Sequence, residues 1–321
     1  MAEEAKQNPA VKSKPANRSF LLGMLLTLAA ACLWGSTYPV IKIDLQYYSP
    51  YDVSFLRAFF ASASLLVYFL IAKKKFLFIP RDRKLFLLLV SSSFFGATGF
   101  WTLLNLGVLF IDPDISSFLV ATYPLIAIVF ATLFLKERMT PAKALGVVLG
   151  IIGTFVIVGF GQGARLVGSN PVLGEIFSIL AAFSWAGYMV TTKKLMGRMD
   201  SRTGMVLDSE YVTFTTFAIA IVPTIIITGL DSLSSLDIVQ PVGLGLAIYL
   251  GVLTSAFAFV IFNTGMKWIG MSRAAVNQLI FPGVAVLSSY ALLGELINFD
   301  EVGGIVLIIL GIIIAQLLSK E

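Results

Sequence analysis

The chain has 321 residues, of which 58% are hydrophobic and 13% charged, and its formal net charge is +5 at pH 7. Soluble globular domains are about 45–50% apolar and about 25% charged, so this composition excludes an ordinary water-soluble protein. The single cysteine and the lack of histidine exclude an intrachain disulfide, histidine acid–base catalysis and a Cys/His metal site.

Ten apolar stretches follow one another along the chain. A helix crosses the hydrocarbon core with about 20 apolar residues. The stretches span residues 20–41, 51–72, 85–110, 114–135, 142–160, 172–192, 209–229, 241–265, 272–293 and 299–318. The sequence therefore predicts an all-α membrane protein with ten transmembrane helices, whose backbone hydrogen bonds are satisfied within each helix.

The basic residues predict how these spans are oriented, because Lys and Arg collect in short cytoplasmic loops. If residues 1–19 form a cytoplasmic tail, all basic residues except Lys42, Arg57 and Arg165 fall on the cytoplasmic side. The opposite loops are acidic and carry Asp44, Asp52, Asp112, Asp114, Asp231, Asp237, Glu295, Asp300 and Glu301. We expect a multi-pass protein of the plasma (cell inner) membrane with both termini cytoplasmic, embedded in the lipid bilayer and with no nucleic-acid partner.

The sequence repeats itself after the fifth span. At an offset of 158 positions the matching pairs are Asn105/Asn263, Gly107/Gly265, Pro124/Pro282, Glu137/Glu295, Gly146/Gly304 and Gly153/Gly311, and an offset of 151 aligns Gly23/Gly174, Trp34/Trp185 and Lys42/Lys193. We predict one five-helix repeat at 20–160, an extracytoplasmic linker at 161–171 and a second repeat at 172–319. Five is odd, so the second copy is inverted, and the loop charges reverse with it. Inverted repeats are typical of secondary transporters.

These repeated residues resemble a known family. Trp34-Gly35-Ser36-Thr37-Tyr38, Arg57-Ala58-Phe59 and the two copies running from Pro124 to Glu137 and from Pro282 to Glu295 are similar to the drug/metabolite transporter (DMT) superfamily, specifically its EamA-type members with two five-helix repeats. The resemblance covers residues 20–318. It implies a central cavity lined by spans 1–4 and 6–9, peripheral spans 5 and 10, and movement of small metabolites, often export of amino acids or related compounds. The second half departs from the pattern: it has no arginine matching Arg57.

Polar and aromatic side chains on the expected cavity helices form the candidate substrate site. They are Trp34, Thr37, Tyr38, Arg57, Trp101, Asn105, Tyr123, Trp185, Tyr188, Asn263, Asn277 and Gln278. Amide side chains avoid lipid, so the Asn and Gln residues either bind substrate or lock neighbouring helices. Arg57 lies roughly 9 Å into its helix by the helical rise. An intramembrane arginine indicates a functional site, and snorkelling to the outer surface or pairing with Asp52 is the alternative.

Two prolines and two glutamates recur with the repeat. Pro124 and Pro282 each interrupt a helix and free the carbonyl four residues earlier. The resulting kink either serves packing or exposes polar backbone to a cavity. Glu137 and Glu295 each lie three residues before an expected N-cap, where the positive end of a helix favours a carboxylate. We interpret both glutamates as groups that fix the turn between spans rather than as substrate ligands.

Small residues in span 5 (Gly146 and Gly150) and span 10 (Gly303, Gly304 and Gly311) predict close helix contact, either within the monomer or in a homodimer through these peripheral helices. No Asp or Glu lies deep in a predicted span, so the sequence shows no buried carboxylate proton relay. We expect no catalytic residues, no cofactor and no metal.

Together these features predict a secondary transporter that moves small metabolites by alternating access around a cavity between the repeats. Export of amino acids or related amphipathic compounds is the leading activity, with drugs or nucleotide derivatives as alternative cargo. A membrane-embedded enzyme acting on a lipid-linked substrate is the competing class. A channel is disfavoured because no filter-like loop is present.

Overall fold

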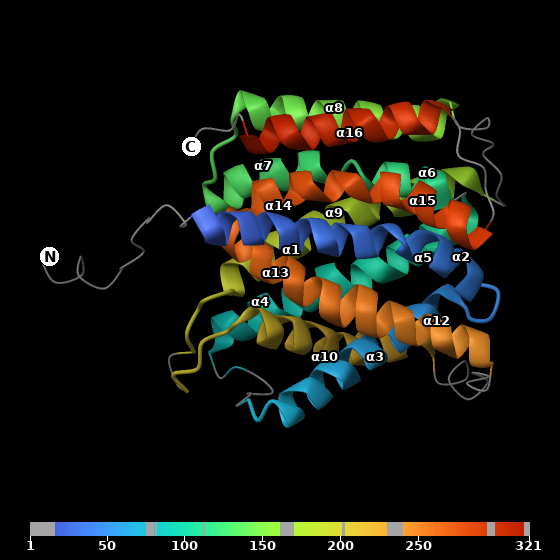
Figure 1. Ribbon diagram of the computed structural model, residues 1–321. Helices are drawn as coiled ribbons and strands as arrows, with labels where there is room; N and C mark the ends of the chain where they lie inside the picture. Colours follow the sequence, from blue (N-terminus) through green and yellow to red (C-terminus); the bar gives the residue numbers. More distant parts are fainter. Residues whose placement is uncertain are drawn as a thin grey trace, which may run out of the picture.

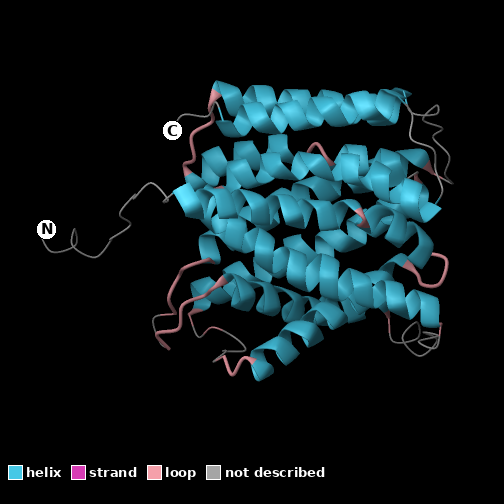
Figure 2. Ribbon diagram, in the orientation of Figure 1, coloured by secondary structure: helices cyan, strands magenta, loops and turns pink. Residues whose placement is uncertain are grey.

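The computed structural model describes residues 17–74, 80, 82–111, 113–160, 170–200, 203–229, 240–293 and 299–317. The expected cytoplasmic tail, apart from residues 17–19, most of the 161–171 linker, and Glu295 lie outside these residues. Within them the chain is helical, and its extended pairing is one isolated antiparallel bridge between Met199 and Val206 (Figure 2). The helices run roughly side by side (Figure 1).

The first repeat supplies five spans. Span 1 consists of α1 (Asn17–Gly35) and α2 (Thr37–Asp44), and span 2 is α3 (Pro50–Ile71). Span 3 consists of α4 (Arg83–Ser93), the π-helical η2 (Phe94–Gly99) and α5 (Phe100–Phe110). Span 4 consists of α6 (Pro113–Val120) and α7 (Tyr123–Leu135), and span 5 is α8 (Pro141–Phe160). Spans 1 and 4 are therefore interrupted within their length, and span 3 contains a π-helical segment.

The second repeat follows the same plan. Span 6 is α9 (Pro171–Leu195) and span 7 is α10 (Ser209–Thr228). Span 8 consists of α12 (Pro241–Gly251), the π-helical η3 (Val252–Phe257) and α13 (Ala258–Ile269). Span 9 consists of α14 (Met271–Asn277), the 3₁₀ turn η4 (Gln278–Ile280) and α15 (Phe281–Leu293), and span 10 is α16 (Phe299–Leu317).

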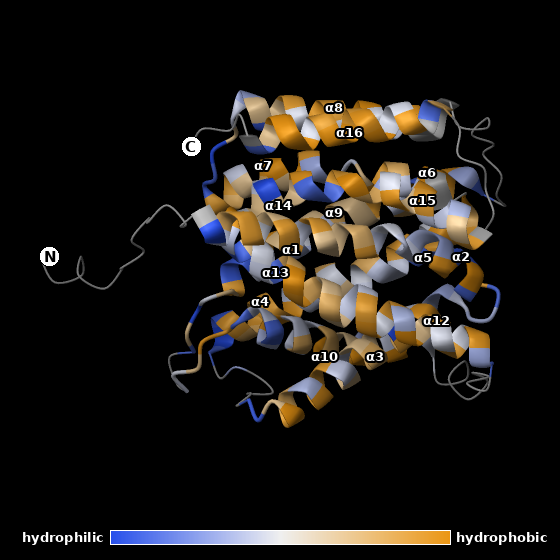
Figure 3. Cartoon of the chain, viewed as in Figure 1, coloured by the Kyte–Doolittle hydropathy of each residue, from blue (hydrophilic) through white to orange (hydrophobic). Residues whose placement is uncertain are grey.

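The lengths and composition of these helices fit a membrane. Eight spans are long and apolar enough to cross a bilayer, and α8 and α16 contribute the shorter apolar stretches Pro141–Val156 and Val302–Gln316. Apolar residues cover the helices, and hydrophilic residues gather toward the helix ends and loops (Figure 3). The prediction of an all-α membrane protein with ten transmembrane helices in two inverted five-helix repeats is confirmed.

The two repeats pack as a pseudo-symmetric pair. α1 packs on α13 as α9 packs on α5, and α3, α7 and α8 pack on their counterparts α10, α14 and α16. The two π-helical segments, Phe94–Gly99 and Val252–Phe257, occupy matching places in spans 3 and 8. A π-bulge frees backbone carbonyls, and such bulges are frequent at functional sites. The two inverted repeats therefore share these π-helical segments as well as their order of helices.

Glycines draw α8 and α16 together at the periphery, where they form a separate layer (Figure 1). A Cβ placed on Gly153 would lie 2.6 Å from the carbonyl oxygen of Gly304, and one on Gly311 would lie 2.5 Å from that of Gly146. These glycine faces are thus used within the monomer. A homodimer through spans 5 and 10 stays a prediction, and it would have to use their other faces.

Candidate functional site

Span 1 is interrupted at Ser36, within the Trp34–Tyr38 motif. Pro39 has no N–H to give to the preceding turn, which weakens the helical hydrogen bonding there. The Ser36 hydroxyl donates to the carbonyl of Leu33 at 2.7 Å and lies 2.6 Å from the Tyr249 hydroxyl. The break turns Trp34 and Thr37 toward the interior of the molecule, where Trp34 Nε1 donates to the carbonyl of Thr254 in η3 at 2.7 Å.

The two repeated prolines lie directly after breaks in spans 4 and 9. α6 ends at Val120 and α7 begins at Tyr123, one residue before Pro124. α14 gives way to the 3₁₀ turn η4 four residues before Pro282. Each proline removes a helical N–H, so these breaks follow from proline chemistry. They place Val120 and Gln278 on the wall of one cavity.

This cavity lies between the repeats and is lined by Trp34, Thr37, Tyr38, Arg57, Phe100, Leu104, Val120, Tyr123, Trp185, Gln278 and Phe281. Its volume is about 40 Å³, room for roughly two or three water molecules. Six aromatic rings form most of its wall. Trp34 and Trp185, the repeat-related pair, meet edge to face with ring centroids 5.1 Å apart. Tyr38 stacks on Phe281 at 5.6 Å. Such a pocket suits a ligand with an apolar body.

Polar atoms of the cavity wall lack partners. Trp185 Nε1 donates to Gln278 Oε1 at 2.9 Å. Because an indole N–H can only donate, this bond leaves the Gln278 amide nitrogen turned away, and that nitrogen has no hydrogen-bond partner among the described residues. The Thr37 hydroxyl is likewise buried and unpartnered within the described chain. A buried polar atom without a partner costs about 1–3 kcal/mol, so these atoms favour a polar ligand or water.

Arg57 is the one charged group among the described residues that line the cavity. Its side chain is 2% exposed. Its Nε donates to Ser255 Oγ at 2.7 Å, its Nη2 donates to Thr254 Oγ1 at 3.3 Å, and the guanidinium lies 4.8 Å above the ring of Trp101. Arg57 therefore neither snorkels to the surface nor pairs with Asp52, which instead forms a capping box with Ser49 at the start of α3.

Asp44 was predicted to lie in an outer loop, but α2 extends to this residue and buries it completely. Both carboxylate oxygens lack hydrogen-bond partners in the described part of the chain. No direct ion pair joins Asp44 to Arg57 among the described residues. Sequence reasoning missed Asp44 because the predicted first span ends at residue 41, whereas α2 continues to Asp44. An acidic residue just beyond an apolar run ordinarily indicates a loop.

Comparison with known proteins decides the family. The model of the EamA-like transporter family matches residues 21–159 and 172–317, one match for each repeat. The chain belongs to the EamA-like transporter family. It is 26% identical to the uncharacterized transporter YdfC of Bacillus subtilis, over 85% of this chain and 84% of the relative. It is 27% identical to a "probable terminal-alkyne amino-acid exporter" of Streptantibioticus cattleyicolor, over 82% of each chain.

A solved protein structure matches with a TM-score of 0.74 and 18% identity, covering 93% of this chain and 97% of that one. At that identity the likeness shows the fold alone. The family match shows that the chain is a multi-pass EamA-family transporter of small molecules, and the relatives above are named as a transporter and an exporter.

In this EamA-like transporter, two predicted site residues act between helices instead of lining the cavity. Asn105 Nδ2 donates to Ser54 Oγ at 2.9 Å and to the carbonyl of Pro50, which ties α5 to α3. Asn263, its counterpart, donates to Thr213 Oγ1 at 3.0 Å and to Tyr188 Oη at 2.7 Å. Both asparagines are fully buried. Each repeat thus contains a buried asparagine whose side-chain amide ties neighbouring helices together, an arrangement that we call an amide lock.

The remaining predicted residues divide in the same way. Seven of the twelve line the cavity: Trp34, Thr37, Tyr38, Arg57, Tyr123, Trp185 and Gln278. Trp101 lies beneath Arg57, and Tyr188 stacks on Trp185 at 4.9 Å. Asn277 donates to Thr27 Oγ1 at 2.7 Å and accepts from Gln316, so it ties α14 to α1 and α16. The sequence did not single out Phe100, Leu104, Val120 or Phe281 as lining residues.

Glu137 binds across the repeat boundary. Its carboxylate accepts from the backbone N–H of Met271 at 2.8 Å, the N–H of Ser272 at 2.9 Å and the hydroxyl of Ser272 at 2.7 Å. It therefore caps α14 of the second repeat instead of the adjacent α8, which begins after Thr140. Gly270 makes the approach possible: its φ is +90°, and a Cβ there would lie 3.3 Å from Glu137 Oε1.

Lys193 complements this cap at the other side of Gly270. Its Nζ donates to the carbonyls of Met266 at 2.7 Å and Lys267 at 3.1 Å, the last turn of α13. A cation at a helix C-terminus and an anion at a helix N-terminus both stabilise the helix dipoles. The α13–α14 junction is thus clamped between Lys193 of α9 and Glu137, which follows α7.

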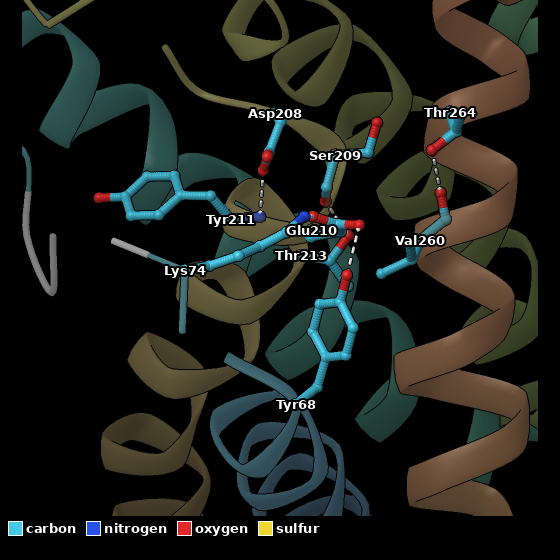
Figure 4. A network of polar contacts seen from close by, with 9 residues as sticks. All are labelled: Tyr68, Lys74, Asp208, Ser209, Glu210, Tyr211, Thr213, Val260 and Thr264. Atoms are coloured by element: carbon cyan, nitrogen blue, oxygen red, sulfur yellow. Dashed lines mark hydrogen bonds and ion pairs between the residues drawn. The ribbon is translucent and has the colours of Figure 1, made fainter. Parts of the chain in front are cut away.

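A second polar network joins α3 to α10 (Figure 4). Lys74 forms an ion pair with Glu210, and the Tyr68 hydroxyl donates to Glu210 Oε1 at 3.1 Å. The hydrogen bond to the carboxylate raises the pKa of Lys74. Asp208 caps α10 by accepting from the N–H of Tyr211 at 2.8 Å. Exposed pairs of this kind contribute about 0–1 kcal/mol, so this network positions helices rather than a substrate.

Proposed function

We propose that this chain is a secondary transporter that moves small amphipathic metabolites by alternating access, and that its activity is export of amino acids or related compounds. The observation that carries the proposal is the central cavity, whose wall combines Trp34, Arg57 and Tyr123 of the first repeat with Trp185 and Gln278 of the second. Movement of one repeat against the other would open such a cavity to one side and then to the other.

The cavity chemistry supports an amphipathic cargo. Aromatic rings form most of the wall, and the Arg57 guanidinium, the Gln278 amide and the Thr37 hydroxyl provide a few polar groups. The name of the Streptantibioticus relative, a probable terminal-alkyne amino-acid exporter, supports amino acids among such compounds. A cavity of about 40 Å³ is too small for an amino acid, so binding requires the repeats to separate from the arrangement described.

The proposal includes an orientation. The start of α1 and the end of α16 lie on the same side of the molecule (Figure 1). That side carries Lys193, Lys194 and Lys267, and Lys and Arg prefer cytoplasmic loops. We place both termini in the cytoplasm and the protein in the plasma membrane.

Transport in inverted membrane vesicles tests the function. Vesicles with and without the protein are supplied with amino acids, amphipathic drugs and nucleotide derivatives, and accumulation of each is measured over time. We expect protein-dependent accumulation of amino acids. If only drugs or nucleotide derivatives accumulate, these compounds rather than amino acids are the cargo. If no compound accumulates, while the purified protein converts a lipid-linked substrate, the transporter proposal fails.

A further inference from the structure

The Arg57 guanidinium makes three contacts within the protein and has one nitrogen without a partner among the described residues. Ser255 and Thr254 accept from Nε and Nη2, and the ring of Trp101 lies beneath the guanidinium plane. The remaining nitrogen, Nη1, is buried and has no hydrogen-bond partner among the described residues. Arg57 lines the cavity that both repeats form, so this unpartnered charged donor belongs to a residue of the cavity wall.

Two further unpartnered donors belong to residues that line the cavity. They are the Gln278 amide nitrogen, which its bond to Trp185 turns away from the indole, and the Thr37 hydroxyl. A carboxylate accepts hydrogen bonds at two oxygens and pairs with a guanidinium in a charge-assisted bond. The unpartnered groups of this wall therefore complement an anionic acceptor, and the aromatic rings beside them complement an apolar body.

The pseudo-symmetry shows that the fold does not require this arrangement. Counting from the N-caps of α3 and α10, Ser49 and Asp208, Thr216 takes the place of Arg57 in the second repeat. The η2 residues at the places of Thr254 and Ser255 are Gly96 and Ala97. The symmetry-related place thus lacks both parts of the arrangement: the second repeat has no arginine there, and η2 of the first repeat has neither hydroxyl. The arginine and the two hydroxyls that hold it occur at one of the two symmetry-related places and not at the other. This asymmetry indicates a ligand-binding role.

We propose that Arg57 is the anion-recognition group of the cavity, and that the transported substrates carry a carboxylate next to an apolar body. This inference rests on the proposed function and narrows its substrate class.

Ligand binding by the full-length protein in lipid nanodiscs tests the proposal. The probes are matched sets built on leucine and phenylalanine: the free amino acid, its N-acetyl derivative, which keeps only the carboxylate, and its amide, which keeps only the amine. We expect the acids to bind at least about tenfold more tightly than the amides. Arg57→Gln should abolish this difference, and Arg57→Lys should retain part of it. Arg198→Gln, which removes an exposed guanidinium, should leave it unchanged.

The comparison of acids and amides in the wild-type protein does not depend on the folding of an Arg57 variant, and size-exclusion chromatography checks that Arg57→Gln is folded. Equal affinities of the wild-type protein for acids and amides, a preference that survives in folded Arg57→Gln, or failure of all acids to bind would each overturn the proposal. Binding of acids without vesicle transport would instead contradict the proposed function and leave the anion site standing.

Discussion

Substitution of Glu137 tests the cap that crosses the repeat boundary. Glu137→Ala removes three hydrogen bonds from the first turn of α14, two from backbone N–H groups and one from the Ser272 hydroxyl. Loss of an N-cap costs about 0.5–2 kcal/mol, and hydrogen bonds to charged groups contribute about 1.5–3 kcal/mol. Glu137 is half-buried, so water can replace part of the lost hydrogen bonding. We therefore expect the free energy of unfolding to fall by roughly 2–4 kcal/mol.

The measurement is thermal unfolding of the purified protein in detergent, followed by tryptophan fluorescence at one fixed heating rate, because unfolding of such proteins is often irreversible. At about 2–4 °C per kcal/mol, the unfolding temperature of Glu137→Ala should fall by roughly 4–16 °C. Glu137→Gln keeps one acceptor oxygen and should lose about half as much. Arg138→Ala, an exposed neighbour, is the control. Unfolding within a degree of wild type for both Glu137 variants would refute the cap as a stabilising contact.

Three further predictions concern the amide locks, the cavity wall and the peripheral helices. Asn263→Leu and Asn105→Leu each remove two interhelical hydrogen bonds. Each substitution should therefore destabilise the protein by roughly 1–3 kcal/mol in the same melting assay. A loss of stability in one variant alone would contradict the equivalence of the two locks. Trp185→Phe removes the N–H that fixes Gln278 and should raise the transport KM several-fold at unchanged protein level, whereas an unchanged KM would show that Gln278 does not need this bond. Gly153→Leu forces α8 away from α16, where a Cβ would lie 2.6 Å from the Gly304 carbonyl; it should lower the yield of folded protein in size-exclusion chromatography, while Gly303→Ala, which meets nothing within 4 Å, should not.

The spans and their inversion were predictable because the bilayer imposes a length on each helix and the repeat preserves Asn, Pro, Glu and Gly at fixed offsets. Arg57 was recognisable since an arginine rarely lies within an apolar span. The proline breaks also follow directly from residue chemistry.

The rest depends on tertiary contacts that no local pattern records. Phe100 and Phe281 line the cavity, but 26 phenylalanines occur in the chain and most serve packing. The π-helical segments arise where spans 3 and 8 pack against the opposite repeat. Glu137 was expected to fix its own turn, and its actual partner, α14, is brought to it by the packing of α7 on α14.

Access to the cavity from each side of the membrane is the most direct test of the central claim. The single cysteine, Cys32, is replaced by serine, and Val120→Cys introduces a thiol on the cavity wall. A membrane-impermeant thiol reagent is then applied to right-side-out and to inverted vesicles. Alternating access predicts labelling from both sides, slowed by a transported substrate. Labelling from one side only, whatever substrate is present, would contradict it.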